Sequence, residues 1–159
     1  MHQKDTSLYN LLRKNLRRIF LMLSDENQII QLLENFTAND YGEFLRDNAT
    51  ENFLFIRPSG NPIDVMGFIE MSTSGDLSDG YCDVQKIRKL DFFSPNAAMC
   101  VFTLRSSFVY KNVQNSDLAT VTAIFKKIKN QWKFSWMHRS SGNSNLALWN
   151  LYSKSCKND

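Results

Sequence analysis

The chain has 159 residues, of which 43% are hydrophobic and 13% aromatic, with 6 glycines and 3 prolines. This length suits a single domain with a buried core, and the composition excludes a disordered or collagen-like chain. The net charge of +3 is uneven: five basic residues against Asp5 give residues 1–23 a charge of +4, which leaves −1 for the remainder. A nucleic-acid-binding protein usually spreads its cations along one working face, so we expect no nucleic-acid partner.

The number and spacing of the cysteines and histidines limit the metal and redox chemistry that we expect. The three cysteines (Cys82, Cys100 and Cys156) form neither a CxxC pair nor a zinc-ligand spacing, which is typical of a reduced cytoplasmic chain. Only two histidines occur, and His2 lies at the N-terminus, so we expect no metal site and no cofactor. No apolar run is long enough to span a membrane. The Arg-rich "LLRKNLRRIF" leaves mitochondrial targeting open as an alternative.

The first predicted element is an amphipathic basic helix over residues 6–23, an extension ahead of a single domain over residues 24–159. The helix either packs on the domain with a solvated basic face or offers a surface to a partner or a membrane. Ser24 is the predicted N-cap of a second helix, "QIIQLLENFTAND". The stretch "YGEFLRDNA" predicts a short third helix.

The middle of the chain changes from strand to helix. Residues 51–57 are rich in β-forming residues, and alternation places two phenylalanines and Arg57 on one face of that strand. The turn residues "PSG" follow, and Asn61 is the predicted N-cap of a helix over residues 62–71 that begins with a proline. A loop is predicted over residues 72–80.

The second half of the chain is predicted to form β-strands. Four are predicted, over residues 81–93, 96–111, 117–129 and 131–140. The dipeptide "KN" at 129–130 predicts a tight hairpin, whereas "KNVQNSD" predicts a looser connection. The stretch "LALWNLY" (146–152) predicts either a short closing helix or an extra edge strand. Helices followed by an antiparallel run indicate an α+β fold in which helices cover one face of a sheet.

The closing strands carry a family resemblance. The stretches "AAMCVFTLRSSF" and "TVTAIFKKIKNQWKFSWMHRSSG" resemble the last strands of SnoaL-like domains in the nuclear transport factor 2-like superfamily. The ending "MHRSSG" is similar to the last strand of the calcium/calmodulin-dependent kinase II association domain. The resemblance implies a cone-shaped, cystatin-like α+β fold, a curved antiparallel sheet wrapped around N-terminal helices. This fold hosts isomerases, dehydratases, ligand binders and oligomerisation modules, so it does not name a function.

The resemblance also implies a cavity behind one face of the sheet. Alternation in the last strand places Trp132, Phe134, Trp136 and His138 on one face, which suits a pocket wall. In that position His138 is a candidate acid or base, which is a common role of histidine side chains. The alternative is a core or rim histidine that is hydrogen-bonded to the backbone.

The other candidate groups also have alternatives. Arg57 would bind a carboxylate bidentately at the cavity rim, or it would form a surface salt bridge with Asp64 or Asp83. Both aspartates are candidate bases, although Asp64 suits the start of a helix equally well. Cys100 is either a small core residue or the partner of His138 in a catalytic pair.

We therefore predict a domain that binds a small apolar or carboxylate ligand in an aromatic-lined cavity, with lyase or isomerase activity as one form of that function. The predicted ligand-binding residues are Arg57, Tyr41, Phe55, Phe68, Tyr110, Trp136 and His138. The predicted catalytic candidates are His138 and Asp64.

The alternative function is a non-catalytic homo-oligomerisation module that dimerises through an exposed sheet face, and the two functions are compatible. The strands hold several residues too polar for an inner core, which fits a wet cavity or a polar dimer face: Thr103, Arg105, Ser107, Thr120 and Thr122.

Overall fold

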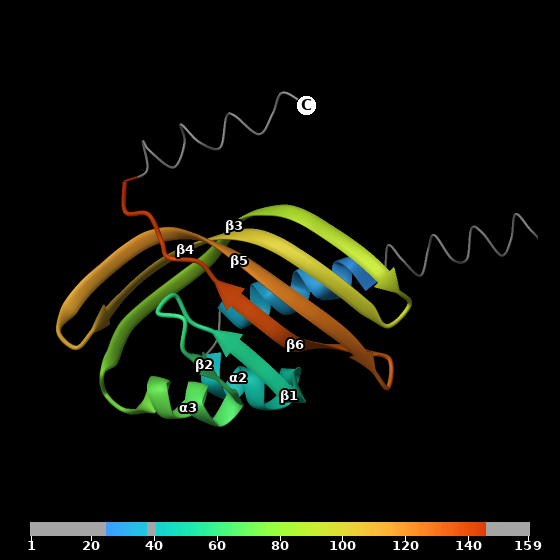
Figure 1. Ribbon diagram of the computed structural model, residues 1–159, viewed down its shortest axis with the longest axis horizontal. Helices are drawn as coiled ribbons and strands as arrows, with labels where there is room; N and C mark the ends of the chain where they lie inside the picture. Colours follow the sequence, from blue (N-terminus) through green and yellow to red (C-terminus); the bar gives the residue numbers. More distant parts are fainter. Residues whose placement is uncertain (1–24, 38–40, 146–159) are drawn as a thin grey trace, which may run out of the picture.

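Figure 1 shows the computed structural model of the chain, which describes residues 25–37 and 41–145. The helices are one over residues 25–37, α2 (Tyr41–Asn48) and α3 (Val65–Thr73). The strands are β1 (Ala49–Ile56), β2 (Pro62–Ile63), β3 (Leu77–Ser94), β4 (Ala97–Tyr110), β5 (Val113–Ile128) and β6 (Gln131–Arg139). The predicted helix over 6–23, the cap Ser24 and the segment 146–152 lie outside the described residues. None of the described helices is long and apolar enough to cross a membrane.

The strands form one curved sheet in the order β2-β1-β6-β5-β4-β3. Strands β3 to β6 are an antiparallel meander, and β1 joins it through a parallel pairing with β6. Four register shifts between β3 and β4 let these long strands bend, because an extra residue in one strand increases the local twist. Figure 1 shows β3, β4 and β5 arching over the helix of residues 25–37. The expected α+β fold with a curved sheet around helices is confirmed, with one parallel pair inside the sheet.

Two of the three tight hairpins of the meander turn on the same dipeptide. Lys129 and Asn130 join β5 to β6 with φ values of 48° and 67°, as predicted for "KN". Lys111 and Asn112 join β4 to β5 in the same way, with φ values of 49° and 62°. Two successive positive φ values match the right-handed twist of the flanking strands. The looser connection predicted after β4 is therefore wrong, and β5 begins at Val113.

The helix predicted over residues 62–71 starts later than expected. Pro62 and Ile63 form β2, which pairs with the end of β1. Proline is tolerated there because an edge strand does not need every backbone N–H in the ladder. Asp64, rather than Asn61, is the N-cap of α3: its Oδ1 accepts a hydrogen bond of 2.8 Å from the Gly67 backbone N–H.

A buried ion pair ties the helix of residues 25–37 to the sheet. Asp25 is 8% exposed, and its Oδ1 accepts hydrogen bonds from Lys127 Nζ at 2.6 Å and from Trp132 Nε1 at 3.1 Å. Phe92 packs edge-on against the Trp132 ring, with centroids 5.8 Å apart. Together these contacts fill one end of the space under the sheet with polar and aromatic side chains.

The two faces of the sheet differ in character. On the inner face of β5, Ala119, Val121, Ala123 and Phe125 are all buried against the helices. The polar residues that were predicted for a cavity or a dimer face lie on the outer face: Thr103, Arg105, Ser107, Thr120 and Thr122. They therefore do not line the space between sheet and helices.

Candidate functional site

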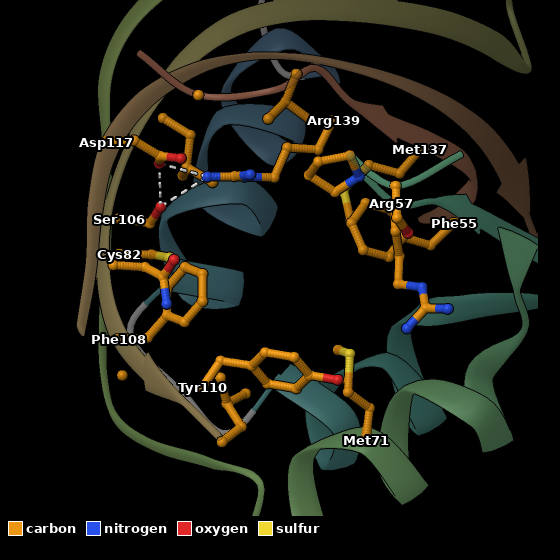
Figure 2. Close-up of a pocket in the computed structure, with 18 of the residues that line it drawn as sticks. Phe55, Arg57, Met71, Cys82, Ser106, Phe108, Tyr110, Asp117, Met137 and Arg139 are labelled. Atoms are coloured by element: carbon orange, nitrogen blue, oxygen red, sulfur yellow. Dashed lines mark hydrogen bonds and ion pairs between the residues drawn. The ribbon is translucent and has the colours of Figure 1, made fainter. Parts of the chain in front are cut away.

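A cavity of about 620 Å³ lies between the inner face of the sheet, α3 and the helix of residues 25–37. Its wall is mostly apolar, with five phenylalanines drawn from helices and strands alike: Phe36, Phe55, Phe68, Phe102 and Phe108. Figure 2 shows the labelled lining side chains arranged around an open space, with Tyr110 and Met71 on one side and Met137 on another. A volume of this size suits a small organic molecule.

Strand β6 changes face in its middle. The pairing with β5 shifts between Ile124 and Phe125, so that Phe134 and Trp136 are opposite successive residues and Ser135 is an extra residue. Such a bulge reverses the alternation beyond it. Trp132 and Phe134 therefore lie on the inner face, as predicted, and the next inward side chains come from Met137 and Arg139.

This bulge corrects the predicted positions of two site residues. Trp136 and His138 do not line the cavity but share the outer face, where their rings lie 6.0 Å apart. His138 is exposed. Cys100 is fully buried on the inner face, so the two residues of the suggested Cys100–His138 pair lie on opposite faces of the sheet.

Three polar side chains form a cluster on the cavity wall, which we call the polar cluster: Ser106 of β4, Asp117 of β5 and Arg139 of β6. Ser106 and Asp117 are direct register partners, and Ser106 Oγ donates to Asp117 Oδ1 at 2.8 Å. Arg139 Nη2 donates to the same Oδ1 at 2.5 Å and to Ser106 Oγ at 2.9 Å. The cluster therefore holds an ion pair inside a mostly apolar wall (Figure 2).

Gly142 completes the packing of this cluster. It follows β6, where the chain continues beside β5 through hydrogen bonds between Leu118 and Asn143. A Cβ atom on Gly142 would lie 1.7 Å from Asp117 Oδ2, a distance at which atoms overlap. The backbone therefore approaches the carboxylate as closely as it does because position 142 has no side chain.

Arg57 lies on the other side of the cavity. Its Nε donates to the Asn61 carbonyl at 3.4 Å, and two backbone hydrogen bonds close the turn that positions it, from Arg57 N–H to Asn61 and from Gly60 N–H to Arg57. Figure 2 shows its guanidinium opposite the polar cluster. Within the described residues Arg57 forms no ion pair, so the alternative salt bridges with Asp64 and Asp83 are absent.

The remaining predicted residues divide into three groups. Phe55, Phe68 and Tyr110 line the cavity, and the rings of Phe55 and Phe68 lie 5.3 Å apart. Asp64 caps α3 and does not line the cavity. Tyr41 begins α2, but its side chain lies outside the described part of the structure.

The polar cluster was missed by the sequence analysis, although one signal for it exists. Asp117 occupies the same alternation as the buried residues of β5, so a carboxylate stands at the end of an otherwise apolar row. Arg139 could not be found by alternation, because the bulge at Ser135 reverses the face. Among the described residues, no group of three or more histidine, cysteine, aspartate or glutamate side chains could hold a metal ion.

Two cysteines of the sheet lie in different environments. Cys82 is half-buried, lines the cavity and is the register partner of Ser106. Cys100 is fully buried, and burial raises the pKa of its thiol to about 12. Cys100 is therefore a neutral core residue rather than a nucleophile.

Comparison with known proteins identifies close and distant relatives. The model of a family described as "Protein of unknown function (DUF3804)" matches residues 24–150. A crystal structure of an NTF2-like protein of unknown function from Prochlorococcus marinus is 52% identical, with a TM-score of 0.71 over 78% of this chain and 98% of that chain. None of the curated proteins matches the sequence.

More distant structures share the fold alone. A hexachlorocyclohexane dehydrochlorinase is 11% identical with a TM-score of 0.67, covering 79% of this chain and 93% of its own. The association domain of the calcium/calmodulin-dependent kinase II of C. elegans is 15% identical with a TM-score of 0.57, covering 76% and 95%. These likenesses and the 52% relative confirm the expected nuclear transport factor 2-like fold. The chain therefore belongs to the DUF3804 family of proteins of unknown function, and its fold is that of the NTF2-like proteins.

Proposed function

We propose that the protein binds a small, largely apolar molecule that carries one carboxylate, with the carboxylate on Arg57. The observation that carries this proposal is a guanidinium without an ion-pair partner in the described structure, placed on an aromatic-lined cavity of about 620 Å³. Relatives in this fold include proteins named as enzymes that act on small molecules, which supports a small-molecule ligand.

The charges of the cavity support a monoanion. Of the described residues that line the cavity, three carry a full charge, and two of these, Asp117 and Arg139, neutralise each other. Arg57 is left as a net charge of +1. A guanidinium binds a carboxylate through two parallel hydrogen bonds, and such charge-assisted bonds are stronger than neutral ones.

The apolar wall supplies the remaining affinity. Each methylene group that moves from water into such a wall contributes about 0.8 kcal/mol. A ligand with a short alkyl or aryl body would therefore bind through its body, and the carboxylate would fix its orientation.

A lyase or isomerase reaction remains a second form of the proposal. Neither of the predicted candidates, His138 and Asp64, lines the cavity, so an acid–base step there would need another group. Asp117 is the carboxylate that lines the described cavity, and it already accepts hydrogen bonds from Ser106 and Arg139.

The binding proposal is tested by calorimetric titration with octanoate, and with octan-1-ol and octylamine as neutral and cationic analogues. We expect octanoate to bind best and Arg57→Gln to weaken it by at least about 10-fold, because a charge-assisted hydrogen bond is lost. Arg46→Gln is the matched control, since Arg46 is exposed on α2 and pairs with Glu43 away from the cavity. Equal binding of octanol and octanoate, or an unchanged Arg57→Gln variant, would overturn the proposal.

A second candidate function, homodimer formation, is favoured by a row of side chains on the outer face. Register places Met99, Ile124, Trp136 and Leu54 side by side on four neighbouring strands. Leu54 is 36% exposed and the other three are half-buried, so the row offers apolar surface to a second copy. A relative named an association domain has the same fold, which supports this proposal.

Light scattering on the intact protein tests the dimer. We expect the mass of a dimer for the wild type and of a monomer for Trp136→Lys, because a lysine ammonium would be buried without a partner in the interface. Met66→Lys is the control, since Met66 is 66% exposed on α3 and lies outside this row. A monomeric wild type at high concentration would contradict the proposal.

A further inference from the structure

We propose that the polar cluster of Ser106, Asp117 and Arg139 is a second recognition site in the same cavity, for an uncharged hydroxyl or carbonyl group of the ligand. This inference rests on the proposed function and narrows the ligand class to acids that carry a neutral hydrogen-bonding group at the end remote from the carboxylate. Three features of the cluster support this assignment: its position, its unused hydrogen-bonding capacity and its charge.

The position of the cluster defines an axis across the cavity. Figure 2 shows Ser106, Asp117 and Arg139 on one wall and the Arg57 guanidinium on the opposite side. The rest of the lining is mostly apolar and includes Phe55, Phe108 and Met137. A ligand that contacts both ends must therefore be polar at both ends and apolar in its middle.

The cluster has N–H donors that make no hydrogen bond to the described residues and are available to a ligand. A guanidinium has five N–H donors, and both hydrogen bonds of Arg139 to described residues come from Nη2 alone. The side chains of Arg139 and Asp117 are 12% and 20% exposed, although both line a largely apolar cavity. An ion pair in such a wall gives little net stability by itself, which is consistent with a role in ligand contact.

The charge of the cluster selects the group that it accepts. Arg139 and Asp117 cancel, so a second carboxylate would gain little from the guanidinium while being repelled by Asp117. A hydroxyl group can accept from Arg139 and donate to Asp117, and a carbonyl group can accept from Arg139. The cluster therefore favours a neutral polar group over an ionised one.

The first experiment uses the wild-type protein and two acids that differ by one hydroxyl group, 4-phenylbutanoate and 4-(4-hydroxyphenyl)butanoate. We expect calorimetry to show about 10-fold tighter binding of the hydroxyl acid, since its hydroxyl group meets charged hydrogen-bonding partners in an apolar site. Equal or weaker binding of the hydroxyl acid would overturn the inference while leaving the monocarboxylate proposal intact. If neither acid binds, both proposals fail.

The second experiment changes the charge of the cluster with little change of shape. In the wild type we expect octanedioate to bind more weakly than octanoate, because Asp117 repels the second carboxylate. In Asp117→Asn the guanidinium of Arg139 loses its counter-ion, so we expect octanedioate to bind about 10-fold better than octanoate. In the double variant Asp117→Asn with Arg139→Gln the preference for octanedioate should disappear. A preference that is unchanged in a folded Asp117→Asn variant would overturn the inference, and the wild-type comparison decides it if that variant does not fold.

Discussion

The two arginines of the cavity differ in their hydrogen-bond and ion-pair partners. Arg139 is held by Asp117 and Ser106, so its charge is neutralised inside the protein. Arg57 contacts the carbonyl of Asn61, which contributes a dipole but no countercharge. An anion that enters the cavity therefore gains most at Arg57 and least at Arg139.

Two successive residues of β6 should affect ligand binding differently. We expect His138→Ala to leave the octanoate affinity within about twofold, because His138 lies on the outer face. Met137→Ala should weaken octanoate by about fivefold, since Met137 contributes apolar surface to the wall. Calorimetry on both variants checks this, and an equal loss in His138→Ala would contradict the face assigned to it.

Gly142 should be intolerant of any side chain. Because a Cβ atom there would overlap Asp117 Oδ2, Gly142→Ala must displace the carboxylate from its hydrogen bonds, at a cost of about 1–3 kcal/mol. Gly80→Ala is the matched control, because nothing lies within 4 Å of a Cβ at that position. Urea unfolding of the two variants measures the difference, and equal stabilities would be inconsistent with the packing around Asp117.

The buried thiol gives a chemical test of the core. A pKa of about 12 leaves Cys100 almost entirely protonated at pH 8, with a thiolate fraction of about one in 10⁴. In a Cys156→Ser background we expect Ellman's reagent to modify one thiol of the folded protein, that of Cys82, and a second one only after unfolding. Rapid modification of both thiols in the native state would show that Cys100 is accessible.

At the scale of the elements, Asp25 supplies a polar contact between the helix of residues 25–37 and strands β5 and β6, beside the apolar packing of that helix on the sheet. Asp25→Ala would leave the ammonium of Lys127 and the indole N–H of Trp132 without their acceptor, at a cost of about 3 kcal/mol. Thermal unfolding should show this loss, whereas Glu43→Ala, which removes an exposed ion pair with Arg46, should change little. A similar stability for both variants would mean that the buried pair does not anchor the helix.

The helices and strands also show which parts of the fold the sequence patterns predict. The strands of the meander and the turn at Lys129 and Asn130 were predictable, because alternation and turn residues are local signals. The first turn of α3 was misplaced because Pro62 suits an edge strand as well as a helix start, and only the pairing of β2 with β1 decides between them.

The candidate site was predictable only in part, and for one physical reason. Arg57 directly follows β1, and buried and more exposed residues alternate over Phe53–Ile56, so its place on the cavity follows from that local alternation. The bulge at Ser135 leaves no local signature, and it moves His138 out of the cavity and Arg139 into it. The polar cluster depends on that bulge, so strand alternation alone could not assemble it.

At the scale of the molecule, the curved sheet separates two surfaces with different uses. Its inner face meets the helices and encloses the cavity, which Arg57 and the polar cluster line. Trp132 and Phe92 pack under the same sheet outside the cavity lining. Its outer face carries the apolar row that we propose for a second copy. Ligand binding and dimer formation would therefore use opposite sides of the same strands and need not interfere.

The most direct test of the central claim is a crystal structure with 8-bromooctanoate, in which anomalous scattering locates the bromine. We predict bromine inside the cavity beside the phenylalanine rings, with the carboxylate within hydrogen-bonding distance of the Arg57 guanidinium. Bromine elsewhere, or a carboxylate turned away from Arg57 toward Arg139, would contradict the proposal that Arg57 is the anion anchor of this cavity.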